Sequence, residues 1–72
     1  MSKPSPNAKQ MIAFKVGARA RKFALEDCFI EGYEVLYTAL AETKEADPEM
    51  HALLMVELEK YEKRVAAIEE EA

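Results

Sequence analysis

The stretch ADPEM, residues 46–50, constrains the fold most, because it marks where a helix begins. Asp47 is a natural N-cap, Pro48 suits the first helical position, and Glu49 faces the positive end of the helix dipole. The residues just before it, ETKEA, offer only a short connection. The segment therefore predicts a tight turn into a helix.

Apolar residues recur at heptad spacing on both sides of this turn. After the turn they are Leu54, Leu58, Tyr61, Val65 and Ile68, and before it they are Phe29, Tyr33, Leu36 and Leu40. A short turn makes neighbouring helices antiparallel, so the two stripes should meet. The predicted register pairs Leu40 with Leu54, Leu36 with Leu58, Tyr33 with Tyr61 and Phe29 with Val65.

Composition supports an all-α fold of a single small domain. The chain has 72 residues, of which half are apolar and a third are charged. Good helix formers dominate and β-branched residues are scarce. We expect a flexible N-terminal tail over residues 1–6 and one small helical domain over residues 7–72. The segment NAKQ predicts that Asn7 caps the first helix together with Gln10.

Residues 8–21 extend beyond the reach of this hairpin. In the predicted register Lys22 lies opposite Ala72, so the preceding residues overhang by about 21 Å of helix. Two structures would cover them. The chain either forms a long first helix that pairs with a second copy, or folds back as a third short helix to give a three-helix bundle. The segment KFALED offers no obvious loop, which favours the long helix.

This N-terminal segment is also the predicted contact surface. It combines apolar residues with basic ones, and exposed apolar patches usually mark contact sites. The candidate partner-binding residues are Met11, Ile12, Phe14, Lys15, Arg19 and Lys22.

The residue types needed for catalysis are sparse, and we expect no enzyme, no cofactor and no metal site. His51 is the only histidine and is expected on the solvated start of a helix. Cys28 lacks a nearby base, and the neighbouring Asp27 should raise its pKa. Gly17 and Gly32 are isolated, so no phosphate-binding loop is present. The three tyrosines have helical spacing, which favours packing over base stacking.

Nucleic acid is the rival partner, because Lys15, Arg19 and Lys22 share one helix face. Three or four phosphate contacts would support weak, salt-sensitive binding. The net charge of −4 and the acidic residues from Glu26 onward oppose it. We therefore expect a protein partner.

The segments EGYEVLYTAL and KYEKRVAAIE resemble the second and third helices of microtubule-interacting-and-trafficking domains. The resemblance covers about half of the chain and implies a three-helix module that binds helical peptides. Two departures are evident. Tyr33 stands four residues before Tyr37, where that family usually carries a small residue, and the sequence near Asp27 lacks the expected loop. No site residue is carried over from the family.

Together these features predict a non-enzymatic protein-interaction module. Such a chain suits a small regulator or inhibitor that docks on a larger protein or self-associates, as a homodimer, through its N-terminal helix. No apolar run is long enough to cross a membrane, and the N-terminus lacks a signal peptide. We therefore expect a cytoplasmic protein without a membrane partner.

Overall fold

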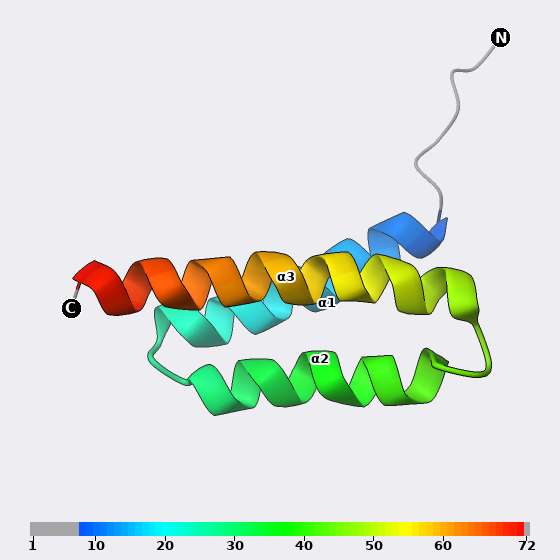
Figure 1. Cartoon of the computed structure of the whole chain (residues 1–72), viewed down its shortest axis with the longest axis horizontal. Helices are drawn as coiled ribbons and strands as arrows, with labels where there is room; N and C mark the ends of the chain where they lie inside the picture. The colour runs from blue at the N-terminus through cyan, green and yellow to red at the C-terminus, as the bar shows by residue number, and fades with distance from the viewer. Residues whose placement is uncertain (1–7, 72) are drawn as a thin grey trace, which may run out of the picture.

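The computed structural model describes residues 8–71, which form three helices and no strand. They are α1 (Ala8–Leu25), α2 (Phe29–Thr43) and α3 (Pro48–Glu71). In Figure 1 α2 runs antiparallel to both neighbours, so α1 and α3 run in the same direction. The all-α prediction is confirmed, and of the two predicted architectures the three-helix bundle is found. The predicted tail at 1–6 and the predicted cap at Asn7 lie outside the described residues.

Helices α2 and α3 form the predicted antiparallel hairpin. The Tyr33 ring meets the Tyr61 ring edge-on with 4.8 Å between centroids, as the register requires. The Tyr61 hydroxyl donates a 2.7 Å hydrogen bond to the Phe29 carbonyl. Leu36 is fully buried, and the other leucines of the two stripes are also buried: Leu40, Leu54 and Leu58. Large apolar side chains therefore fill this contact.

The prediction of one long first helix is wrong, because the chain reverses at residues 26–28. Asp27 has a φ of 63°, in the left-handed region. Its amide donates to the Ala24 carbonyl at 3.1 Å, and the Cys28 amide donates to the Phe23 carbonyl at 2.8 Å. These two bonds are the Schellman pattern that ends helices, usually on a glycine. Asp27 takes the glycine position, since Asp tolerates this conformation better than most residues. This joint also supplies the loop whose absence was a departure from the three-helix family.

The turn before α3 is built as predicted. The Asp47 carboxylate accepts a 3.1 Å hydrogen bond from the Met50 amide, which confirms the N-cap. Lys9, at the start of α1, donates to Asp47 at 3.1 Å and to Glu49 at 3.2 Å. The Met50 amide and then Lys9 lower the pKa of Asp47. The turn therefore also ties the beginning of α1 to the beginning of α3.

The inward face of α1 is made of small residues. Its buried positions are Ala13, Gly17, Ala20 and Ala24. They follow one another at intervals of four, three and four residues, so they share one face. Such a face lets the backbone of α1 approach the α2–α3 hairpin closely, but it buries little apolar surface per residue.

Candidate functional site

The three large apolar residues of the predicted contact surface lie on the outside of α1. Met11, Ile12 and Phe14 are 47%, 52% and 55% exposed, respectively. Figure 1 gives the reason: the N-terminal part of α1 rises past α3 and away from α2, so neither neighbour can cover its outer side. Folding back as a third helix therefore does not bury these residues. The bundle and an exposed apolar surface coexist.

The predicted basic residues lie on the same outer half of α1. Lys15, Arg19 and Lys22 are all exposed, and their spacing places them on one helix face. Ile12 and Phe14 lie near the two edges of this half, because residues two apart on a helix are about 200° apart. All six predicted residues thus belong to one broad outer surface, which we call the α1 outer surface: Met11, Ile12, Phe14, Lys15, Arg19 and Lys22. It carries three positive charges.

A buried ion pair that the sequence pattern did not predict joins α1 to α3. Glu57 is only 5% exposed, and its carboxylate accepts from Arg21 at 2.9 Å and from Lys60 at 3.3 Å. This carboxylate lies against Gly17, where any Cβ would overlap it. The Arg21 guanidinium also lies 5.5 Å from the centre of the Phe14 ring. The sequence does contain a signal for this ion pair: Glu57 is an acidic residue next to the apolar stripe of its helix, and the N-terminal segment that could face it is basic.

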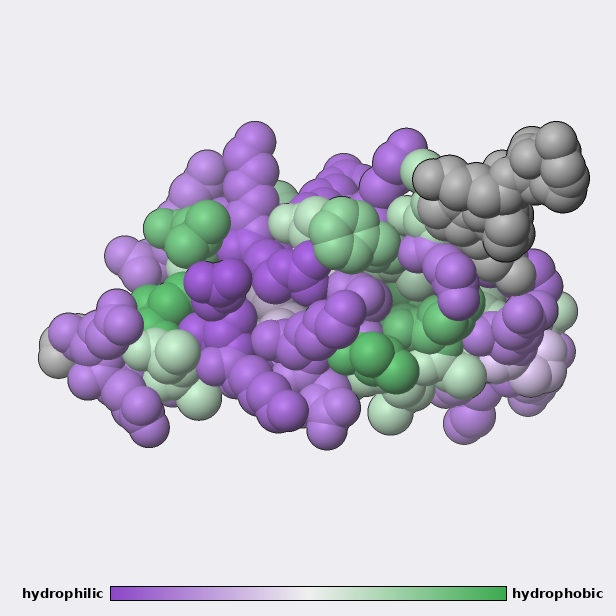
Figure 2. Space-filling view, turned by 90° about the horizontal axis from the view of Figure 1, so that it is seen from above, coloured by the Kyte–Doolittle hydropathy of each residue, from purple (hydrophilic) through white to green (hydrophobic). Residues whose placement is uncertain are grey.

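A basic hollow lies beside this ion pair, between α1 and α3. It is lined by Arg21, Lys60, Lys63, Arg64 and Ala67. Among residues 8–71, Lys63 and Arg64 make no ion pair. Acidic residues outnumber basic ones from Glu26 onward, yet three of the four basic residues in that part of the chain gather here. Figure 2, which shows the side of the molecule away from α2, displays polar and apolar groups interspersed on this side.

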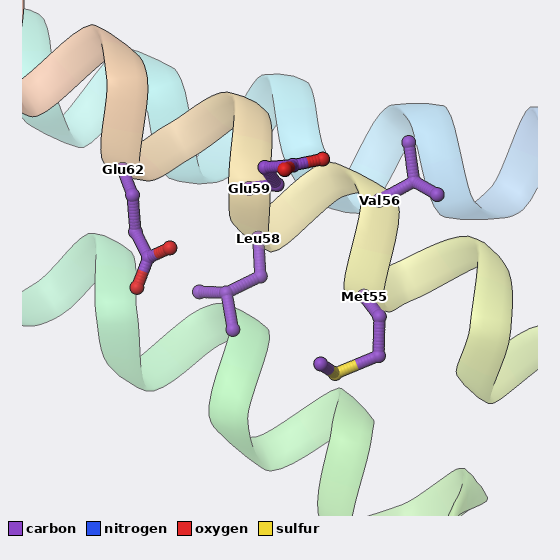
Figure 3. Close-up of a pocket in the computed structure, with 5 residues that line it drawn as sticks. All are labelled: Met55, Val56, Leu58, Glu59 and Glu62. Atoms are coloured by element: carbon purple, nitrogen blue, oxygen red, sulfur yellow. The ribbon is translucent and has the colours of Figure 1, made fainter.

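The opposite flank of α3 carries an acidic depression. It is lined by Met55, Val56, Leu58, Glu59 and Glu62. In Figure 3 Met55, Leu58 and Glu62 point toward α2, whereas Val56 points away from it and Glu59 extends along α3. Because these side chains diverge, the depression does not enclose a ligand. Its chemistry is that of an open surface.

The residues considered for catalysis lie apart from these surfaces. His51 is half-buried rather than solvated, because its Nδ1 lies 3.1 Å from the Leu40 carbonyl. When Nδ1 carries the proton, it donates a hydrogen bond to the Leu40 carbonyl, one of the last carbonyls of α2, which have no partner within the helix. Cys28 is partly buried at the start of α2. Burial raises the pKa of its thiol, and Glu31, Glu26 and Asp27 raise it further.

The described residues also lack two other kinds of site. Over residues 8–71 no three His, Cys, Asp or Glu side chains gather in a way that could hold a metal ion. Within the same range no helix is long and apolar enough to span a membrane.

Comparison of the chain with protein families, curated proteins and solved structures gives no match. The site is therefore interpreted from its own geometry.

Proposed function

We propose that this protein is a non-enzymatic protein-interaction module. It acts as a small cytoplasmic regulator or inhibitor that docks on a larger protein, or on a second copy, through the α1 outer surface. One observation carries the proposal: α1 buries small residues and leaves the large apolar residues Met11, Ile12 and Phe14 exposed. A helix that served only to complete the bundle would place them the other way round.

The chemistry of the α1 outer surface suits a protein partner. Aromatic residues, methionine and arginine are enriched in the cores of protein interfaces, and Phe14, Met11 and Arg19 supply one of each. Met11 and Phe14 are about half exposed, so covering them completely would contribute about 1.5–3 kcal/mol. The surrounding Lys15 and Lys22 favour an acidic partner surface. The partner is thus expected to combine an apolar socket with carboxylates.

The proposal is tested with two matched double variants. Met11→Ser with Phe14→Ser alters α1, and Met55→Ser with Val56→Ser alters an equally exposed apolar pair on α3. Each protein is immobilised, and proteins retained from a lysate of the native host are quantified by mass spectrometry. We expect the wild type and the α3 variant to retain the same partner, and the α1 variant to lose it at least tenfold. Equal retention by both variants, or a wild type that retains neither a host protein nor a second copy of the chain, would contradict the proposal.

Nucleic acid is the second candidate because of the basic hollow. Arg21, Lys60, Lys63 and Arg64 add four cations near the basic face of α1, which the sequence alone did not suggest. The net charge of −4 still opposes a long-range attraction to phosphates. Salt-dependent, sub-micromolar retention of the wild type on DNA or RNA, abolished by Lys60→Gln with Lys63→Gln, would favour this candidate.

Peptide binding of the kind implied by the resemblance to microtubule-interacting-and-trafficking domains remains a prediction. The three-helix architecture agrees with such binding, but the resemblance assigns no peptide-binding residue in this chain. Binding of an isolated helical peptide at a surface other than the α1 outer surface would support this prediction.

A further inference from the structure

The last two turns of α3 carry a charge pattern that is symmetric about one alanine. Lys63 lies four residues before Ala67, and Glu71 lies four residues after it. Arg64 and Glu70 lie three residues before and after the same alanine. Residues three or four apart share a helix face. Ala67 is exposed and lines the basic hollow together with Lys63 and Arg64, so this face is open to a partner.

The four charges of this pattern are unpaired within residues 8–71. Neither Lys63 nor Arg64 makes an ion pair, and the same is true of Glu70 and Glu71. They cannot pair with each other in one chain, because six to eight residues of helix separate them, which is about 9–12 Å along the axis. Each group also has an unfavourable setting. The two cations lie beside Lys60 and Arg21, and the two acids lie at the negative end of the helix dipole.

We infer that this face of α3 pairs with the same face of a second copy, antiparallel, with the two Ala67 residues facing each other across a two-fold axis. In that arrangement Lys63 of each copy meets Glu70 of the other, and Arg64 meets Glu71, because each of these pairs lies on the same edge of the contact. An isologous contact of this kind forms every pair twice. The small side chain at the centre lets the two helices approach closely enough for these charges to meet.

The contact is short, so the dimer is expected to be weak. It spans about nine residues of each α3, well below the size of a stable interface, which usually exceeds about 1,000 Å². Exposed ion pairs also lose strength as salt increases. We therefore expect a reversible dimer at high protein concentration and low salt. The inference does not rest on the α1 outer surface, which lies on another helix and stays open in the dimer.

The test uses charge reversal and mixing. The acidic variant carries Lys63→Glu with Arg64→Glu, and the basic variant carries Glu70→Lys with Glu71→Lys. Sedimentation equilibrium gives the mass of each alone and of their equimolar mixture, at low and at high salt. We expect concentration-dependent dimerisation of the wild type, monomers for each variant alone, and a heterodimer at least tenfold tighter than the wild-type dimer in the mixture. Far-ultraviolet circular dichroism checks that both variants keep their helices.

A matched control separates specific pairing from general attraction. Glu42→Lys with Glu45→Lys changes the net charge as much as the basic variant does, but Glu42 is exposed in the last turn of α2 and Glu45 in the turn that follows it. This control should keep the self-association of the wild type and should not bind the acidic variant tightly. A wild type that stays monomeric at all concentrations, or a control that binds the acidic variant as tightly as the basic variant does, would overturn the inference. The Met11→Ser, Phe14→Ser variant should lose the host partner but still form the α3 dimer. This outcome would show that the two surfaces act independently.

The centre of the contact is tested by a cross-link. In a Cys28→Ser background, Ala67→Cys should form an intermolecular disulfide rapidly under mild oxidation, because the two copies of position 67 face each other. Ala66→Cys serves as the control, since its side chain lies about 100° around the helix. Equal cross-linking at both positions would place the contact elsewhere.

Discussion

The two contacts that α3 makes differ in kind. Against α2 it packs large apolar side chains, including Leu36, Leu58 and Tyr61, all of them buried. Against α1 it meets alanines and a glycine, together with the buried ion pair of Glu57 and Arg21. The first contact buries far more apolar area per residue and so contributes most of the hydrophobic stabilisation. The second depends on close backbone approach and on a charged contact that must stay satisfied.

This difference explains how one small chain can both fold and keep a binding surface. The α2–α3 hairpin holds the large residues that folding needs. Because α1 docks through small residues, its large residues Met11, Ile12 and Phe14 remain available on the outside. We therefore expect α1 to be the less stably held of the three helices. The following predictions test that comparison.

The largest effect is expected from a charge in the α2–α3 contact. Leu36→Asp would bury a carboxylate without a partner, at a cost of roughly 4 kcal/mol or more. A domain of this size has roughly 3–5 kcal/mol to lose, so the variant should be largely unfolded. Circular dichroism and thermal melting measure this. Thr38→Asp, on the exposed side of α2, is the control and should melt within a few degrees of the wild type.

A smaller loss is expected from breaking the ion pair that holds α1. Arg21→Ala leaves the Glu57 carboxylate with only Lys60, whose side chain is about half exposed, and should cost about 1–3 kcal/mol. Urea denaturation measures the free energy of unfolding. The control is Glu59→Ala, which removes an exposed acid of α3, the helix that carries Glu57. It should change the free energy of unfolding by less than about 0.5 kcal/mol. An Arg21→Ala variant as stable as the wild type would show that the ion pair does not hold α1.

The two buried glycines give a direct comparison of the contacts. A Cβ on Gly32 would overlap the hydroxyl and ring of Tyr61, and a Cβ on Gly17 would overlap the carboxylate of Glu57. Overpacking costs about 1–3 kcal/mol, offset by up to about 1 kcal/mol of helix propensity. The tyrosine ring is rigid and buried, whereas a carboxylate can swing aside. Gly32→Ala should therefore destabilise more than Gly17→Ala, and the reverse order in thermal melting would contradict this account of the two contacts.

The weakest effect is a pH dependence at the start of α3, which involves α1 through Lys9. Asp47 has a lowered pKa in the folded protein, mainly because of the Met50 amide and then Lys9. Its contribution is therefore complete above its ordinary pKa of 3.8 and is lost as the pH falls through the lower folded value. Asp47 and then Glu49 raise the pKa of Lys9, so the alkaline loss of its contribution begins only above 10.5. The stability difference between the wild type and Asp47→Ala should shrink as the pH falls below about 4. A difference that is constant down to pH 2 would exclude this linkage.

The hairpin could be predicted from the sequence because its signals are local and periodic. The cap at Asp47, and the aromatic pairing of Tyr33 with Tyr61, follow from spacing alone. The joint at Asp27 could not, because the helix ends on a left-handed aspartate where glycine is usual. Nor could the basic hollow, since Arg21 and Lys60 are far apart in the sequence and meet only once α1 folds back. Met11, Ile12 and Phe14 are exposed, but their role in binding a partner stays a prediction, and the helix that carries them is shorter than expected.

Native-state hydrogen exchange, read residue by residue, tests the difference between the two contacts most directly. It reports the free energy of opening for each helix in the folded protein. We predict that the buried amides of α1, at Ala20 and Ala24, exchange with lower opening free energies than those at Leu36 and Leu58. In Arg21→Ala the gap should widen, with the α2–α3 amides changing less than those of α1. Equal protection in all three helices, falling together in the variant, would contradict the account.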